Sequence, residues 1–151
     1  MKKTLIITLL ILSSTLVFSQ FKYGVGAVYE FERNTDLLKK SYGIHGRVSY
    51  EVLSFVDVVA AAELLILKEG FYGATGNRLR LNININVIEN ESFCLNLIGG
   101  YNSSQLGDYT RATAPEFGIG VRLGQVFIES RYTDNKSIND GFVSFNIGFH
   151  F

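Results

Sequence analysis

The chain has 151 residues, of which 47% are hydrophobic and 19% charged, with fifteen glycines, one proline and one cysteine. This length fits a single domain, and the apolar and aromatic content excludes an intrinsically disordered chain. Fourteen basic residues balance fourteen acidic ones, which gives no indication of nucleic acid as a partner, and one cysteine with two histidines predicts neither a disulfide nor a metal site or bound cofactor.

The first nineteen residues predict a secretory signal peptide. Two lysines precede an apolar run from Leu5 to Phe18, and cleavage is expected after Ser19. The alternative is a membrane anchor helix, but the run is shorter than the roughly 20 apolar residues that a spanning helix needs. No cysteine follows the cleavage point, so a lipid anchor is not expected. We therefore expect residues 1–19 to be removed and residues 20–151 to form one exported domain.

From Phe21 onward, polar and apolar residues alternate with a period of two, which predicts β-strands. The pattern predicts eight strands, at residues 21–33, 41–53, 55–67, 77–89, 92–103, 115–124, 125–133 and 141–151. Short connections alternate with longer polar ones along the chain. This arrangement is typical of an all-β, eight-stranded antiparallel up-and-down transmembrane β-barrel with both termini on the periplasmic side.

Residues 54–69 also permit a helix. Ser54 and Asp57 could form an N-terminal capping box, and an alanine-rich run follows them. A helix here would leave seven strands and break the alternation of connection lengths, so we expect a strand. Its register is the least certain, because Val59, Ala61 and Leu65 fall on its otherwise polar face.

Residue size predicts which face lies inside the barrel. An eight-stranded barrel is only just wide enough to be filled by side chains, so small residues should face inward. The polar phase carries most of the glycines, namely Gly24, Gly26, Gly43, Gly100, Gly118, Gly120, Gly124 and Gly148. We therefore expect a polar interior and an apolar face toward lipid.

The polar phase also carries charges that should form an ion-paired network in this interior, which would leave no room for an aqueous channel. The predicted network comprises Glu30, Glu32, Arg47, Glu51, Asp57, Glu63, Arg78, Arg80, Glu116, Arg122, Glu129 and Arg131. A proton or ion pathway is the functional alternative to a purely structural polar core. Aromatic residues gather near both ends of the outward phase, as in the two interfacial girdles of a membrane barrel.

With these features, the chain resembles the small eight-stranded outer-membrane β-barrel proteins of the OmpX and OmpA-barrel type over residues 20–151. The most specific element is the ending, in which Phe145, Ile147, Phe149 and Phe151 stand at two-residue steps. The resemblance implies that these residues are a signal for the barrel-assembly machinery and that the protein resides in outer-membrane lipid. The cleavage region, Val-Phe-Ser-Gln, is also similar to that of exported proteins of the Bacteroidetes type.

The sequence leaves three functions open. The first is a non-enzymatic structural or surface-interaction role through the outer loops, where Phe71, Tyr72 and Tyr109 could contact an extracellular ligand. The second is a soluble periplasmic, lipocalin-like barrel with inverted faces and a small apolar ligand. The third is an enzyme acting on lipopolysaccharide acyl chains. That enzyme is disfavoured, because His45 and His150 are expected at opposite ends of the barrel, and pairing Phe31 with Tyr42 would place only Glu30 and Val28 beside His45.

Overall fold

The structure is a computed structural model that describes five stretches of the chain, at residues 20–32, 40–67, 75–106, 111–135 and 140–151. The expected signal peptide lies outside the described residues, as do Phe71, Tyr72 and Tyr109 of the expected outer loops. Within the described stretches, no helix is long and apolar enough to cross a bilayer.

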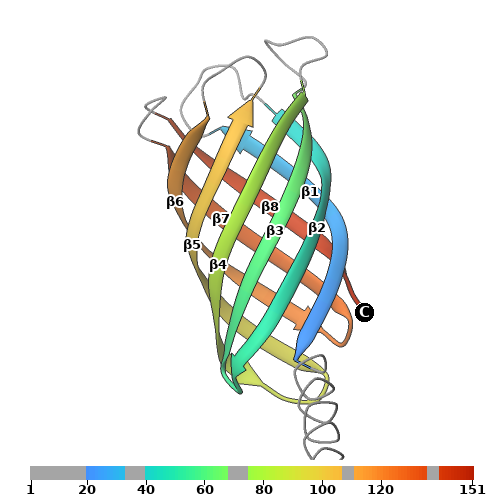
Figure 1. Ribbon diagram of the computed structural model, residues 1–151. Helices are drawn as coiled ribbons and strands as arrows, with labels where there is room; N and C mark the ends of the chain where they lie inside the picture. Colours follow the sequence, from blue (N-terminus) through green and yellow to red (C-terminus); the bar gives the residue numbers. More distant parts are fainter. Residues whose placement is uncertain (1–19, 33–39, 68–74, 107–110, 136–139) are drawn as a thin grey trace, which may run out of the picture.

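Eight antiparallel strands close into a tilted barrel (Figure 1). They are β1 (Phe21–Glu32), β2 (Lys40–Leu53), β3 (Val56–Leu67), β4 (Thr75–Glu89), β5 (Phe93–Leu106), β6 (Ala112–Leu123), β7 (Val126–Asn135) and β8 (Asp140–His150). Each strand pairs with the next, and β8 pairs with β1. The expected fold class is confirmed, and β3 is a strand rather than the alternative helix.

The two rims of the barrel differ. The turn end carries the tight connections β2–β3, β4–β5 and β6–β7. The loop end, at the top of Figure 1, carries the strand ends on either side of residues 33–39, 68–74, 107–110 and 136–139. In the β4–β5 turn, the Asn90 side-chain oxygen accepts hydrogen bonds from the backbone N–H groups of Ser92 and Phe93, at 3.1 and 2.8 Å. Gly124 occupies the β6–β7 turn with φ of 58°, so the expectation that it faces the interior is wrong.

The seam between β1 and β8 is closed by backbone hydrogen bonds. The N–H of Phe151 donates to the carbonyl of Tyr23 at 2.8 Å, and the N–H of Tyr23 donates back at 3.3 Å. These bonds continue the β1–β8 ladder to the last residue of the chain, so no strand edge is left open along this seam.

The register between β1 and β2 differs from the expected one by two residues. Tyr42 lies opposite Tyr29, not opposite Phe31. As a result, His45 lies opposite Gly26, and the expected placement of Glu30 and Val28 beside it is wrong. A slip of two residues keeps every side chain on its own face, so alternation alone does not reveal it.

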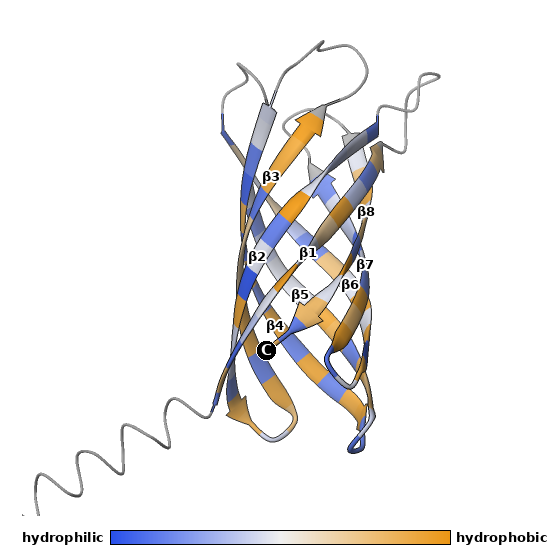
Figure 2. Cartoon of the chain, turned by 90° about the vertical axis from the view of Figure 1, so that its right-hand side faces the viewer, coloured by the Kyte–Doolittle hydropathy of each residue, from blue (hydrophilic) through white to orange (hydrophobic). Residues whose placement is uncertain are grey.

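Hydrophobic and hydrophilic residues alternate along the strands (Figure 2), and the outward-facing residues form an apolar belt. Ile44, Leu81, Ile83, Leu97 and Ile119 around the barrel are each at least half exposed. An apolar surface that encircles the molecule needs hydrocarbon rather than water around it. The molecule is therefore a transmembrane barrel, and the soluble alternative with inverted faces is wrong.

The inward face is mainly polar and leaves no space for a side chain at several glycines. A Cβ added at Gly118 would lie 2.9 Å from Cγ of Arg131, and one at Gly148 would lie 2.6 Å from the Phe127 ring. By contrast, a Cβ at the outward-facing Gly46 would meet no atom within 4 Å. The inward glycines thus provide the volume that the large interior side chains of neighbouring strands occupy.

The polar lining is interrupted on β3. Val59 and Leu65 are both 1% exposed, so they face inward together with Glu63 on the same strand. The expected register of this strand is therefore the one observed, and β3 contributes apolar packing to an otherwise polar interior.

Candidate functional site

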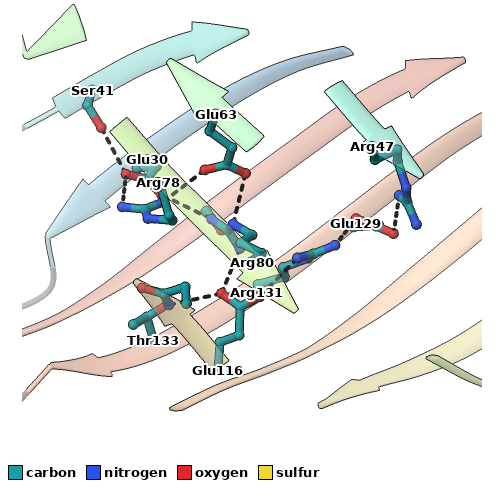
Figure 3. Close-up of polar contacts among 12 residues, drawn as sticks. Glu30, Ser41, Arg47, Glu63, Arg78, Arg80, Glu116, Glu129, Arg131 and Thr133 are labelled. Atoms are coloured by element: carbon teal, nitrogen blue, oxygen red, sulfur yellow. Dashed lines mark hydrogen bonds and ion pairs between the residues drawn. The ribbon is translucent and has the colours of Figure 1, made fainter. Parts of the chain in front are cut away.

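Buried arginines and glutamates cross the barrel interior in an alternating order (Figure 3). This central chain is made of Arg47, Arg78, Arg80, Arg131, Glu30, Glu63, Glu116 and Glu129. Its four positive and four negative side chains balance, as burial in a low-dielectric interior requires.

The central chain begins near the loop end with Arg78 on β4. Its Nη2 donates to Glu30 of β1 at 3.1 Å, and its Nη1 donates to both Glu30 and Glu63. The guanidinium also lies over the ring of Phe142, with Cζ at 4.6 Å from the ring centroid. Glu30 accepts a further hydrogen bond from the hydroxyl of Ser41 at 3.0 Å.

Arg80 is the branching point of the central chain. Its Nε lies 2.8 Å from Glu63, its Nη1 lies 2.8 Å from Glu116, and its Nη2 lies 3.4 Å from Glu30. Nη2 also donates to the hydroxyl of Ser144 at 3.2 Å. The Arg80 side chain is fully buried, and its guanidinium lies close to three carboxylates from three different strands.

Arg131 continues the central chain from Glu116 toward the turn end. Its two terminal nitrogens bind Glu116 at 3.0 Å and Glu129 at 2.5 Å. Glu129 in turn binds Nη1 of Arg47 at 2.7 Å, where the central chain ends. Glu116 also accepts a hydrogen bond from the amide of Asn102 at 3.0 Å, so neutral side chains complete the network.

The remaining predicted residues do not join the central chain. At the turn-end mouth, Arg122 binds Glu89 at 2.6 Å and lies 4.0 Å from Asp57. Glu51 pairs there with Lys22 at 3.2 Å and is more than one-third exposed. The side chain of Glu32 lies outside the described residues. Among the described side chains, no group of three or more histidine, cysteine, aspartate or glutamate residues is placed to hold a metal ion.

Sequence reasoning missed Glu89 and Lys22 at this mouth. A register shift between Asn86 and Ile88 changes the parity of β4, so Glu89 falls on the side that binds Arg122. No alternation pattern identifies such a bulge. For Lys22 a signal was present, because it shares the polar phase with Gly24 and Gly26.

The two histidines share one environment, which the sequence expectation had excluded. The ring of Phe127 lies with its centroid 5.5 Å from that of His45 and 4.7 Å from that of His150. Cζ of Arg47 lies 4.4 Å from the same ring centroid. We call these four residues the Phe127 cluster. They meet because β2, β7 and β8 are staggered around the barrel, so residues at different positions along their strands reach one level.

No protein-family model matches the sequence, and no curated protein does. Several solved structures do match the chain. Ail of Yersinia pestis is 14% identical with a TM-score of 0.57, and 87% of this chain and 97% of Ail are covered. The N-terminal domain of Pseudomonas aeruginosa OprF is 12% identical with a TM-score of 0.58, over 86% of this chain and 97% of that domain. Neisserial surface protein A is 10% identical with a TM-score of 0.61, over 87% of this chain and 96% of that protein.

The chain has the fold of the small outer-membrane β-barrels. At these identities the likeness is one of fold. A designed transmembrane barrel matches in the same way, with 11% identity and a TM-score of 0.54. Because a designed sequence shares the fold, the fold by itself assigns no activity.

Proposed function

We propose that the chain is a non-enzymatic integral outer-membrane protein, that its interior is sealed against ions, and that it serves envelope structure or surface interaction. The central chain carries this proposal. Its members Arg80 and Glu116 have fully buried side chains in mid-barrel, where an eight-stranded barrel is just wide enough to be filled. A continuous water path through such a cross-section is not expected.

Conductance tests the sealed interior. The purified barrel, reconstituted in planar lipid bilayers, should show no steady conductance steps above the bare membrane. The matched variant with both Arg80→Ala and Glu116→Ala removes two filling side chains without a net charge change, and it should leak measurably. Steady porin-like steps from the unmodified barrel would contradict the proposal.

The histidine environment supports a non-enzymatic role. His45 and His150 pack on Phe127 beside a guanidinium, and the hydroxyl of Ser49 donates to the backbone carbonyl of Lys22 at 3.3 Å. A hydrolase or acyltransferase would need a nucleophile in contact with its base. Mass spectrometry of lipid A should therefore show the same acylation in cells with the wild-type protein, with His45→Ala and without the protein.

A surface role requires that the loop end faces outward from the cell. Thr75 lies at the loop end and Ser54 at the turn end, and both are exposed. In a Cys94→Ser background, a membrane-impermeant maleimide should label Thr75→Cys on intact cells and label Ser54→Cys only after the outer membrane is permeabilised. The reverse pattern would contradict the proposed orientation.

The outer segments are the proposed contact region. Ail has been crystallised in complex with the heparin analogue sucrose octasulfate, so one structural neighbour has been seen with a sulfated sugar bound. In this chain we assign contact to the aromatic residues Phe71, Tyr72 and Tyr109. Cells that display the wild-type barrel should bind at least one member of a glycan array, and replacing the three residues with serine should abolish that binding. Equal binding by both would refute the assignment.

The C-terminal residues are the proposed signal for the barrel-assembly machinery. Phe145, Phe149 and Phe151 expose their side chains on the outward face of the seam. Phe151 is 73% exposed although its backbone is bound to Tyr23. Its ring is therefore available for recognition and contributes little packing to the barrel itself.

A further inference from the structure

We propose that the outward surface of β4, β5 and β6 binds a lipid with a phosphate headgroup, which Arg111 holds by its phosphate while an acyl chain lies against Gly99. The three strands are neighbours in the barrel wall (Figure 1). The site is on the outside of the barrel, so it is separate from the central chain and from the turn-end mouth. Its place in the outer leaflet of the membrane rests on the orientation proposed above.

Arg111 immediately precedes β6, and its side chain reaches across β5 to β4. Its Nη2 donates to the side-chain oxygen of Asn77 on β4 at 2.9 Å, and its Nη1 donates to the hydroxyl of Ser103 on β5 at 3.4 Å. Asn77 is exposed and shares the outward phase of β4 with Leu79. Ser103 shares the outward phase of β5 with Tyr101. The guanidinium therefore lies on the outer surface of the barrel and not in its interior.

The hydrogen bonds of Arg111 orient its guanidinium without neutralising it. Asn77 and Ser103 are neutral acceptors, whereas Arg47 in the interior binds the carboxylate of Glu129. The two bonds use two of the five N–H donors of an arginine side chain. A planar guanidinium that is held in place presents its other donors in a geometry that matches phosphate oxygens.

The surface around Arg111 lies at the upper edge of the apolar belt. The exposed Thr113 pairs with Ser103, and two residues farther along β6, Pro115 pairs with Tyr101. The Tyr101 side chain is 63% exposed, as expected of an aromatic residue in the girdle where headgroups meet hydrocarbon. A positive charge just above this girdle is at the level of the lipid phosphates. Lipid phosphate is therefore the anion that the position of Arg111 fits.

Below this level, the lipid-facing wall has open space at Gly99. A Cβ added at Gly99 would meet no atom within 4 Å. Gly99 pairs with Ile83 on β4 and with Phe117 on β6, and both of these side chains are more than half exposed. Six residues separate Arg111 from Phe117, which is about 20 Å along the strand. An acyl chain of the bound lipid fits between the two exposed side chains and gains dispersion contacts there.

Tryptophan fluorescence tests the proposal, because the chain contains no tryptophan and Phe117→Trp places a single reporter beside Gly99. The whole mature barrel is folded into phosphatidylcholine vesicles in which either phosphatidic acid or phosphatidylcholine carries bromine on its acyl chains. Brominated chains quench an adjacent tryptophan, so quenching reports which lipid occupies the site. Phosphatidic acid should bind there about fivefold more strongly than phosphatidylcholine, the effect of one cation on an anionic lipid.

Arg111→Gln in the reporter barrel should lower this ratio to about one. Equal binding of the two lipids beside the reporter, or a ratio that Arg111→Gln leaves unchanged, would overturn the proposal. Tyr101→Trp on β5 supplies a second reporter if Phe117→Trp does not fold. These measurements do not depend on the orientation of the barrel in cells, so their failure would leave the proposed function untouched.

Lys40→Gln is the matched control for Arg111→Gln. Lys40 is exposed at the loop end of β2, which lies across the barrel from β6, so its replacement removes the same charge far from the reporter. The fivefold ratio should persist in this variant. Equal losses in Lys40→Gln and Arg111→Gln would reveal general electrostatic attraction and overturn the assigned site.

Glycerol 3-phosphate separates a lipid site from a site for free phosphate. It carries the headgroup phosphate of phosphatidic acid but no acyl chain. In excess in the buffer, it should leave quenching by brominated phosphatidic acid unchanged. Displacement of the brominated lipid by glycerol 3-phosphate would overturn the assignment of the site to a lipid.

Discussion

Replacing Arg80 with methionine should destabilise the barrel by about 3–5 kcal/mol, the usual cost of removing one partner from a buried ion pair. We expect a destabilisation of this size because Arg80 is fully buried and lies within 3.4 Å of three carboxylates. Methionine keeps most of the side-chain length and removes the charge. Glu30 and Glu63 would then depend on Arg78 alone, and the buried network would carry one excess negative charge. The unfolding constant should rise between about 150-fold and 5,000-fold.

Arg122→Met is the matched control for this prediction. The Arg122 side chain is 17% exposed and that of its partner Glu89 is 37% exposed, so solvent screens the pair and its loss should cost about 1 kcal/mol or less. Arg47→Met should cost an intermediate amount, because Glu129 keeps its bond to Arg131.

Urea titration of the refolded proteins in phospholipid vesicles measures these differences. Folded and unfolded barrels are separated on unboiled denaturing gels, on which a closed barrel migrates differently from the boiled chain. The reasoning is refuted if Arg80→Met loses no more stability than Arg122→Met. If Arg80→Met yields no folded barrel, the comparison of Arg47→Met with Arg122→Met tests the same gradient.

Three further predictions concern the exterior, the interior space and the C-terminus. Ile83 lies near the middle of β4 and faces lipid, so Ile83→Lys should destabilise the barrel by about 2–4 kcal/mol. The band whose gel mobility changes on boiling should then be absent from outer-membrane fractions. Val87→Lys, near the turn end, should cost about 0–1 kcal/mol and keep that band. Gly26→Ala should lower the urea midpoint of unfolding, because the added Cβ would collide with backbone atoms of β8. Gly46→Ala should leave the midpoint unchanged, because the added Cβ meets no atom within 4 Å. Equal effects of the two variants would contradict the packing argument. Phe151→Ala should reduce the amount of barrel assembled in cells but leave the free energy of unfolding of the refolded protein within about 0.5 kcal/mol of wild type. Normal assembly of this variant in pulse-chase experiments would exclude the proposed signal.

Alternation predicts the faces of this barrel well because the face of a strand residue depends only on parity. Arg78, Arg80 and Glu116 could be placed inside from the sequence for this reason, and Ile83 outside. Pairing register is a separate quantity. Slips of two residues preserve parity, so the position of His45 opposite Gly26 depends on how side chains pack around the whole closed barrel.

Strand ends were harder to predict than strand faces. β5 runs to Leu106 and β6 begins at Ala112, although Ser103, Ser104 and Gln105 have the composition of a loop. Ser104 pairs with Ala112 in the ladder, so backbone hydrogen bonding extends beyond the apolar segment. Polar outward residues are tolerated where a strand rises above hydrocarbon, so composition there marks the edge of the membrane and not the end of the sheet.

The central chain joins positions that are remote along the polypeptide. Arg80 and Glu116 are 36 residues apart, Arg78 and Glu30 are 48 apart, and Arg47 and Glu129 are 82 apart. These contacts cross the barrel interior between strands that are not neighbours in the sheet, so we expect them to form only when the sheet curls round. Interactions that appear after the rate-limiting step retard unfolding and leave the folding rate almost unchanged. We therefore expect the charged interior to slow the unfolding of the closed barrel without making its formation faster.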